Sequence, residues 1–238
     1  MNLVYRVRNR LAMAVLTAAM ALPSIVLAGS IDAFTDELPP NPYFEDFPIL
    51  FVDLSHPIDV ADQGGLAQVL GGGRRSTLVD PAPNAGSFSA VEIYGGALSV
   101  STDVASRAVF TLEYGAIDAL NANLFLSSDA FIIDLTFADM DDSTPVRPVP
   151  TTITVTSGLG TPSAATASRT IPLIGEGVYV FAYADFAGAD FSDVDRITIE
   201  FDASSVESVD FTLGPLTTRD TTVRTQNTTW GGLKARYR

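Results

Sequence analysis

The 238-residue chain contains no cysteine and a single histidine, His56. Without cysteine it cannot form disulfides, thiolate zinc sites or cysteine-ligated iron–sulfur clusters, and it has no thiol nucleophile. One histidine also excludes any mechanism that needs two imidazoles. Basic residues are few, 14 against 28 acidic ones, whereas nucleic-acid binding depends on clustered lysine and arginine. We therefore expect no nucleic-acid partner.

Long hydrophobic runs are absent as well, and the first apolar run has the form of an export signal. Three arginines precede an apolar core over residues 11–22, which is shorter than the ~20 residues needed to span a bilayer. Residues 26–28 (Val-Leu-Ala) then provide a cleavage site. We predict a signal peptide over residues 1–28 and a mature chain that is secreted or held at the cell surface, with no membrane span. A retained anchor helix is the alternative.

Apolar residues alternate with polar ones, or run in short blocks, from residue 31 to residue 213, and Gly, Pro, Asn, Asp and Ser clusters interrupt them. This spacing is typical of all-β proteins. Only residues 62–70 and 116–122 look helical, and neither is long enough for a βαβ unit. We predict an antiparallel two-sheet β-sandwich of the jelly-roll kind. Its clearest strands are expected at residues 96–102, 108–114, 130–137, 151–156, 178–183, 196–201 and 208–213.

Side-chain patterns assign faces to two of these strands. Ile197, Ile199 and Phe201 alternate with polar residues, so they are expected to face the core. Residues 131–133 (Phe-Ile-Ile) are consecutive and apolar, which predicts a central strand covered on both faces. Acidic residues 139–142 (Asp-Met-Asp-Asp) follow that strand and are interpreted as a solvated turn.

We predict one β-sandwich domain over residues 29–215. A Pro- and aromatic-rich insertion at about residues 36–57 is expected to lie over the domain, because prolines exclude a regular central strand. Residues 216–229 are polar and are predicted to be a linker.

A basic aromatic tail, residues 230–238, follows the predicted linker. Trp230, Leu233 and Tyr237 would share one face of a helix. Two hypotheses stay open, a recognition tag read by a sorting or attachment machinery and a segment that folds back on the acidic domain. The basic residues around the apolar face are Lys234, Arg236 and Arg238.

Three short motifs carry a family resemblance. They are residues 31–34 (I-D-A-F), residues 70–75 (L-G-G-G-R-R), and residues 186–201 (F-A-G-A-D-F-S-D-V-D-R-I-T-I-E-F) followed by residues 209–213 (V-D-F-T-L). Together they resemble secreted bacterial β-sandwich proteins of unknown function, many of which end in a PEP-CTERM sorting signal. That signal is absent here. More distantly, the plan is similar to galactose-binding-like sandwiches, which include many carbohydrate-binding modules.

The galactose-binding-like resemblance implies a structural calcium ion that joins the first and last strands. Asp32 and Asp210 match those places, and ordinary outward-facing strand acids are the alternative interpretation. Asp190 and its neighbours are interpreted as turn caps around Phe186 and Phe191, which are expected to close one end of the sandwich.

Arginines and exposed aromatic residues are the candidate ligand contacts. Arg74 and Arg75 follow three glycines and are expected either to pair with buried carboxylates or to contact an anion or sugar hydroxyl. Sugar binding needs exposed aromatic rings, and the alternative for these rings is that they extend the core. The predicted platform consists of Tyr43, Phe44, Phe47 and Tyr94.

No catalytic residue is predicted. His56 precedes a proline, and no Gly-x-Ser-x-Gly segment accompanies it. We therefore expect an exported noncatalytic binding or structural module with a glycan or another cell-surface component as its partner. The alternative is a secreted jelly-roll hydrolase acting on polysaccharide, which would need two carboxylates roughly 5–10 Å apart across a cleft.

Overall fold

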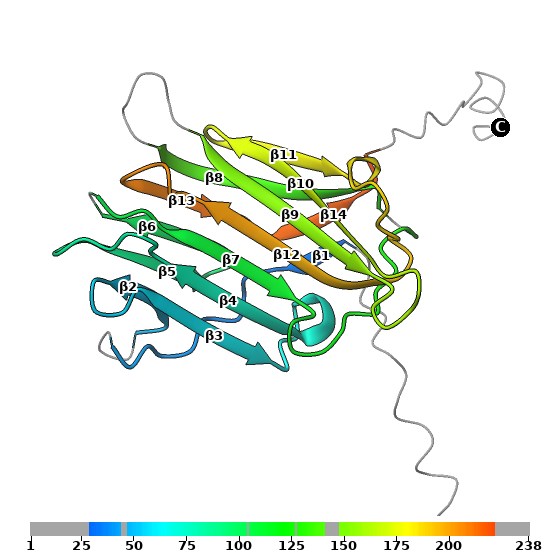
Figure 1. The fold of residues 1–238 in the computed structure, drawn as a ribbon, viewed down its shortest axis with the longest axis horizontal. Helices are drawn as coiled ribbons and strands as arrows, with labels where there is room; N and C mark the ends of the chain where they lie inside the picture. The colour runs from blue at the N-terminus through cyan, green and yellow to red at the C-terminus, as the bar shows by residue number, and fades with distance from the viewer. Residues whose placement is uncertain (1–28, 44–46, 104, 127, 141–147, 222–238) are drawn as a thin grey trace, which may run out of the picture.

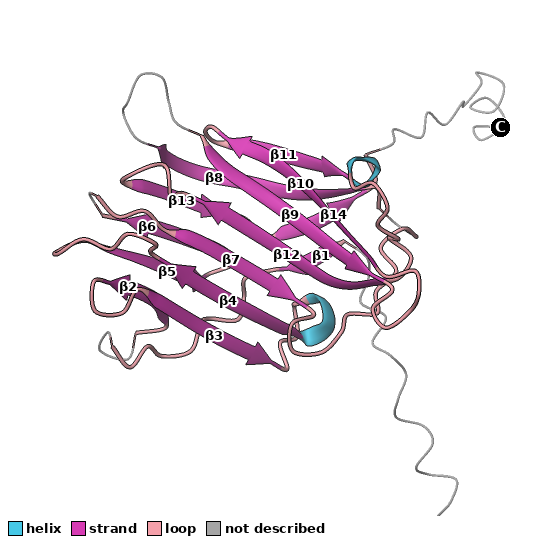
Figure 2. Cartoon of the chain, viewed as in Figure 1, coloured by secondary structure: helices cyan, strands magenta, loops and turns pink. Residues whose placement is uncertain are grey.

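The computed structural model describes residues 29–43, 47–103, 105–126, 128–140 and 148–221. Over these residues the chain forms fourteen strands in two antiparallel sheets, together with two short 3₁₀ turns, η1 (Leu70–Gly72) and η2 (Tyr183–Asp185). Figures 1 and 2 show the sheets stacked face to face. The predicted all-β antiparallel sandwich is confirmed. No helix in the described part of the chain is long and apolar enough to cross a membrane.

We name the two sheets A and B. Sheet A contains β1 (Ser30–Asp32), β2 (Ile49–Asp53), β5 (Phe88–Tyr94), β6 (Ala97–Thr102), β8 (Ala130–Met140), β11 (Gly177–Ala182), β13 (Val209–Leu213) and β14 (Leu216–Arg219). Sheet B contains β3 (Ile58–Gly64), β4 (Gly73–Val79), β7 (Val109–Tyr114), β9 (Val149–Ser157), β10 (Ala165–Leu173) and β12 (Val194–Asp202).

The strand pairing is that of a jelly roll. Among the consecutive strands β6 to β13, β6 pairs with β13, β7 with β12, β8 with β11 and β9 with β10. The pairs β13–β8 and β12–β9 then join these hairpins into one half-sheet each, β6-β13-β8-β11 and β7-β12-β9-β10. Eight strands wound in this way across two sheets define the jelly roll. Strands β5 and β2 extend sheet A, and β4 and β3 extend sheet B.

Strands β13 and β14 follow one another along the same edge of β8. Strand β11 pairs with residues 130–135 of β8, while β13 and β14 pair with residues 135–140 and 130–132. Since a strand has two edges and β11 occupies one, β13 and β14 share the other. Strand β1 then adds to β14, and β6 adds to β13.

The seven predicted strands are all present, and the face assignments are confirmed. Ile197, Ile199 and Phe201 are at most 1% exposed. Residues 131–133 are buried near the start of β8, between β11 on one edge and β14 on the other. Phe186 and Phe191 are also buried, and the backbone N–H of Ser192 donates to Oδ1 of Asp190, so the predicted turn cap and aromatic plug are both observed.

Two predicted helical segments are wrong. Residues 58–64 pair with β4 at seven consecutive positions, so the first part of the segment 62–70 is strand β3, and only residues 70–72 form a 3₁₀ turn. Residues 116–122 form bends and one isolated bridge, from Ala122 to Val194. In both places hydrogen bonds to a neighbouring strand replace those that a short, glycine-flanked helix would make.

Three predicted boundaries also change. The segment 36–57 contains β2, which pairs with β5 at the edge of sheet A, the place where a strand next to prolines is tolerated. The predicted linker 216–229 begins with β14, since Leu216 and Thr218 are buried and their strand pairs with β8. Residues 139 and 140, predicted as a turn, prolong β8.

Candidate functional site

The structure divides the described aromatic residues of the predicted platform between the two ends of the β2–β5 strand pair. Tyr43 is 61% exposed and its ring stacks on that of His56, with 4.1 Å between the centroids. Phe47 is also exposed, just before β2, and Tyr94 is 69% exposed at the end of β5. Phe44 lies outside the described residues. The tail residues Trp230 to Arg238 lie outside them too.

Arg74 lies inside the protein and pairs with Asp32. The two side chains are 0% and 1% exposed, and Arg74 Nη1 is 2.8 Å from Asp32 Oδ2. Arg74 Nη2 donates to the side chain of Gln63 and to the backbone carbonyl of Asp36. The Tyr114 hydroxyl donates to the same Asp32 oxygen, at 3.1 Å. Of the two interpretations of Arg74, the structure shows the buried carboxylate partner, and a side chain without exposed surface cannot contact a ligand.

This cluster joins three parts of the fold: β1 through Asp32, β4 through Arg74 and β7 through Tyr114. Burial raises the pKa of the Asp32 carboxyl, and the Arg74 charge together with hydrogen bonds from Arg74, Phe34 and Tyr114 opposes that rise only in part. Burial also raises the pKa of the Tyr114 phenol well above its ordinary value. The net rise for Asp32 means that desolvation exceeds the attraction to Arg74, as in many buried ion pairs.

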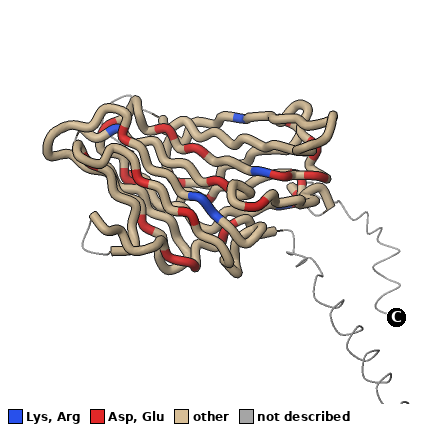
Figure 3. Tube along the Cα trace, turned by 60° about the horizontal axis from the view of Figure 1, so that its bottom comes forward, with Lys and Arg blue, Asp and Glu red and all other residues tan. Residues whose placement is uncertain are grey.

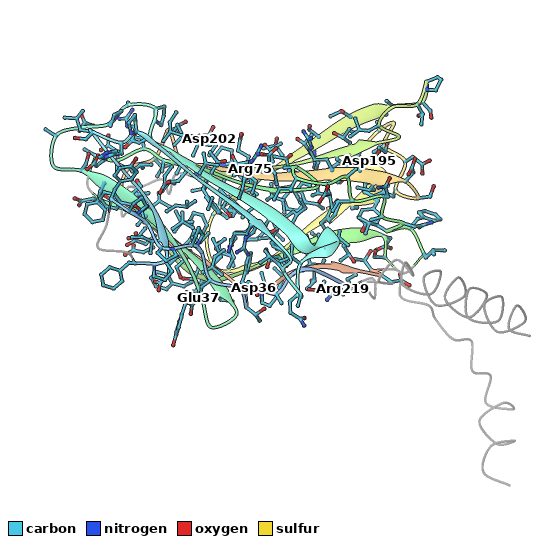
Figure 4. All side chains as sticks on the ribbon, turned by 90° about the horizontal axis from the view of Figure 1, so that it is seen from below. Asp36, Glu37, Arg75, Asp195, Asp202 and Arg219 are labelled. Atoms are coloured by element: carbon cyan, nitrogen blue, oxygen red, sulfur yellow. The ribbon has the colours of Figure 1, made fainter. Side chains whose placement is uncertain are left out.

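Arg75, by contrast, faces outward from sheet B. Its Nε donates to Oδ1 of Asp62 on β3 at 2.7 Å, and its guanidinium is 3.9 Å from Glu113 on β7. The hydrogen bonds from Arg75 hold the pKa of the Asp62 carboxyl below its ordinary value. Figure 4 shows Arg75 and Asp202 on one layer of the sandwich and Asp36 and Arg219 on the other.

The structure does not bring Asp32 and Asp210 together. Asp32 lies opposite Leu216 on β14, six residues along the chain from Asp210, which corresponds to roughly 20 Å at strand spacing. Asp210 Oδ1 instead accepts hydrogen bonds from the Ser101 hydroxyl and the Thr102 N–H. Within the described ranges no group of three or more His, Cys, Asp or Glu side chains is placed to hold a metal ion. Both oxygens of Asp32 are engaged by protein donors.

Polar side chains gather in the middle of the outer face of sheet A. The strand register places Asp139, Asp210 and Ser101 side by side across β8, β13 and β6. The next row contains Thr212 and Ser99, whose hydroxyls are 3.1 Å apart. Each row crosses three strands, or roughly 10 Å. The centre of this face therefore offers hydroxyls and two adjacent carboxylates.

Exposed aromatic rings flank this polar centre on both sides. Phe137 on β8 is 48% exposed and lies opposite Thr212. On the other side, Phe88 on β5 is 42% exposed and stacks against Phe51 of β2, and Tyr94 projects from the same face of β5. Exposed apolar side chains gathered around polar groups are typical of interaction sites. We call the rings and the polar centre together the sheet A face.

Sequence reasoning found two members of the sheet A face, Tyr94 and Asp210, and missed the others. The signal was present in part, because Glu92 and Tyr94 alternate with the apolar residues Val91 and Ile93 and so share the outer side of one strand. Phe137 gave no such signal. Thr212 pairs with Phe137 and the next residue, Leu213, pairs with Leu135, so β8 contains one extra residue there, and this irregularity turns the Phe137 side chain outward.

A separate apolar pocket of about 580 Å³ lies at one end of the sandwich. The rings of Tyr183 and Phe191 stack within it, 3.9 Å apart and nearly parallel, and Phe131 and Phe186 pack edge-on behind them. Its lining residues are Phe125, Asp129, Ala182, Tyr183, Ala184, Ala189, Asp190, Phe191, Ser192 and Thr221.

The buried phenol of Tyr183, in this pocket, is expected to make the stability of the fold depend on pH in the alkaline range. Burial raises the pKa of its phenol to about 12, although a hydrogen bond with Ser128 works in the other direction. The unfolded chain ionises near pH 10 and the folded chain only near pH 12, so the stabilisation is complete below pH 10 and is lost between pH 10 and 12. We expect the free energy of unfolding to fall by roughly 2 kcal/mol over this range, beyond the loss that Tyr114 causes.

Denaturant titrations from pH 9 to pH 12 measure this loss, and Tyr183→Phe is the matched variant. Tyr183→Phe is expected to be the less stable protein at pH 9, because it lacks the Ser128 hydrogen bond. Its stability should then decline less steeply, so that the two curves converge. Parallel curves would contradict the assignment.

Comparisons with known proteins give only distant structural similarities. No protein-family model matches the sequence, and no curated protein does. Among solved structures it is similar to a family 11 carbohydrate-binding module from Clostridium thermocellum in complex with a β-1,3-1,4-mixed-linked tetrasaccharide, at 11% identity and a TM-score of 0.36, covering 72% of this chain and 95% of the other.

A second similar structure is the family 11 module of the C. thermocellum cellulosomal cellulase Lic26A-Cel5E, at 10% identity and a TM-score of 0.37, covering 78% of this chain and 94% of the other. A family 29 carbohydrate-binding module is also similar, at 12% identity and a TM-score of 0.29, covering 68% and 85%. Likeness at this level leaves the function to be argued from the site itself.

Proposed function

We propose that the protein is an exported noncatalytic binding module and that the sheet A face binds a glycan. The observation that carries this proposal is the arrangement of that face, a central group of carboxylates and hydroxyls between exposed aromatic rings. Sugar rings present both hydroxyls and an apolar C–H surface. Charged acceptors such as Asp139 and Asp210 form strong hydrogen bonds with hydroxyl donors, and Phe137 and Tyr94 offer flat apolar surface for the ring faces.

The two adjacent carboxylates also bear on the alternative, a polysaccharide hydrolase. Asp139 and Asp210 are directly opposite one another, which places their Cβ atoms roughly 5 Å apart. Retaining glycosidases likewise use two neighbouring carboxyl groups, held roughly 5–5.5 Å apart. However, a general acid needs an apolar pocket that keeps it protonated. Asp139 is exposed on the open sheet A face and does not line the apolar pocket at the end of the sandwich. The open setting therefore favours binding.

A glycan array with the purified protein, followed by affinity measurements on a polysaccharide that binds, tests the proposal. We expect Tyr94→Ala and Phe137→Ala each to weaken binding tenfold or more, about 1.4 kcal/mol, with little change in stability because both rings are exposed. Tyr43→Ala, which removes an equally exposed ring from another part of the surface, is the matched control and should bind normally.

Three results would contradict the proposed function. The first is an array without any binding glycan. The second is equal loss of binding in Tyr43→Ala, which would move the site to the loop before β2. The third is the appearance of new reducing ends in the bound polysaccharide that Asp139→Asn abolishes, because this would establish the hydrolase.

A further inference from the structure

We propose that the pocket at the end of the sandwich is a docking site for the protein's own tail, with the Trp230 side chain as its occupant. This pocket is distinct from the sheet A face, and the proposal does not depend on glycan binding. It chooses between the two hypotheses for the tail, since a docked tail folds back on the domain. Four properties of the described residues support it: apolarity, size, position and charge.

The pocket is apolar and aromatic where an indole would bind. Its stacked Tyr183 and Phe191 rings are 7% and 6% exposed, and Phe125, which is 71% exposed, extends its rim. Phe125 and the adjoining pocket of about 580 Å³ therefore leave apolar surface uncovered by the rest of the fold. An apolar cavity of about 150 Å³ already takes up benzene, so the pocket has room for an indole and a neighbouring apolar side chain such as Leu233.

The chain leaves the described part of the fold at this pocket. Thr221 lines it, and the Thr221 N–H and hydroxyl both donate to Oδ1 of Asp129 on the rim, at 2.6 and 2.7 Å. Trp230 follows Thr221 by nine positions, which is a reach of at most about 30 Å. A connection of that length would hold the tail at an effective concentration of roughly millimolar. Contacts with a Kd well below millimolar would therefore keep the pocket filled.

Charge favours the same contact. All 28 acidic residues and only seven basic ones lie between residues 29 and 221, a formal charge of −21, whereas residues 222–238 carry four basic residues and no acidic one. Figure 3 shows how widely the acidic residues are spread over the fold. Asp129 and Asp190 lie at the pocket itself. Lys234 and Arg236 would therefore sit close to carboxylates when Trp230 is bound.

Because Trp230 is the single tryptophan of the chain, its fluorescence reports the docking directly. In the intact protein we expect a blue-shifted emission, and quenching by acrylamide that is several-fold weaker than in the same protein unfolded in denaturant. In 1 M NaCl, where the Debye length falls to about 3 Å, the protection should decrease but persist, because the apolar contact remains.

Surface variants locate the contact without disturbing the core. Phe125→Ser and Asp190→Lys should each red-shift the emission and raise quenching toward the unfolded value. Their matched controls, Ile58→Ser and Glu200→Lys, alter exposed residues of sheet B and should leave the fluorescence unchanged. A tryptophan that is fully exposed in the intact protein would overturn the proposal and favour the sorting tag. Protection that neither pocket variant reduces would overturn it as well, because the tail would then bind elsewhere.

Discussion

Replacing Arg74 with methionine is expected to lower the free energy of unfolding by about 3–5 kcal/mol. The substitution keeps most of the apolar volume but leaves the Asp32 carboxylate buried without a counter-charge, at a position where the side chain is 1% exposed. It also removes the donors to Gln63 and to the carbonyl of Asp36. Denaturant unfolding at neutral pH measures the loss.

Arg75→Met is the matched control for Arg74→Met. It removes an arginine from the next position of the same strand, where the ion pair with Asp62 is exposed, and such pairs contribute at most about 1 kcal/mol. In Arg74→Met the destabilisation should also shrink as the pH falls, because a protonated Asp32 tolerates burial. Equal stability losses in the two variants would contradict the role assigned to the buried pair.

Gly115→Ala is expected to have the second large effect, a loss of about 3 kcal/mol or more. Gly115 follows β7 with a φ of +84°, a conformation that costs other residues roughly 1–2 kcal/mol. A Cβ there would also lie 2.2 Å from the backbone oxygen of Asp195 and 3.2 Å from Cα of Arg196. Since these are backbone atoms, β12 itself would have to move, which adds the cost of overpacking.

Gly95→Ala separates the steric effect from the conformational one. Gly95, in the turn between β5 and β6, has a similar φ of +62°, but a Cβ there would meet no atom within 4 Å. It should therefore cost only the roughly 1–2 kcal/mol of the left-handed conformation. Thermal and denaturant unfolding of both variants gives the comparison. If Gly115→Ala is no more destabilising than Gly95→Ala, the close approach of β7 and β12 does not constrain this turn.

Alternation of apolar and polar residues was enough to predict several strands whose buried face is mostly apolar. Ile197, Ile199 and Phe201 are an example, because the core selects apolar side chains at every second position of β12. The same rule missed strands whose inward positions carry polar residues. In β3 the outward residues Ile58 and Val60 are apolar and the inward ones include Asp59 and Gln63, so the pattern is inverted. In β14 the buried Thr218 made the segment look like a linker.

The candidate sites were less accessible to sequence analysis, because they depend on which strands become neighbours. Asp32 and Arg74 are 42 residues apart, and only the fold brings their side chains within 2.8 Å. Likewise, Asp139 and Asp210 meet through the pairing of β8 with β13. Local composition identified exposed aromatic residues such as Tyr43 and Tyr94 correctly as exposed, but it carried no information on whether they share one surface.

The pairing of β1 with β14 places a requirement on how the protein folds. Strand β1 hydrogen-bonds to residues 216 and 217, so its partner is the last strand of the described chain. The jelly-roll pairs also join strands that are distant in the sequence, since β6 pairs with β13 and β7 pairs with β12. Contacts between such distant parts of a chain are slow to form. The sandwich is thus completed late, only when nearly the whole domain is available, and such late completion would suit the export that we propose.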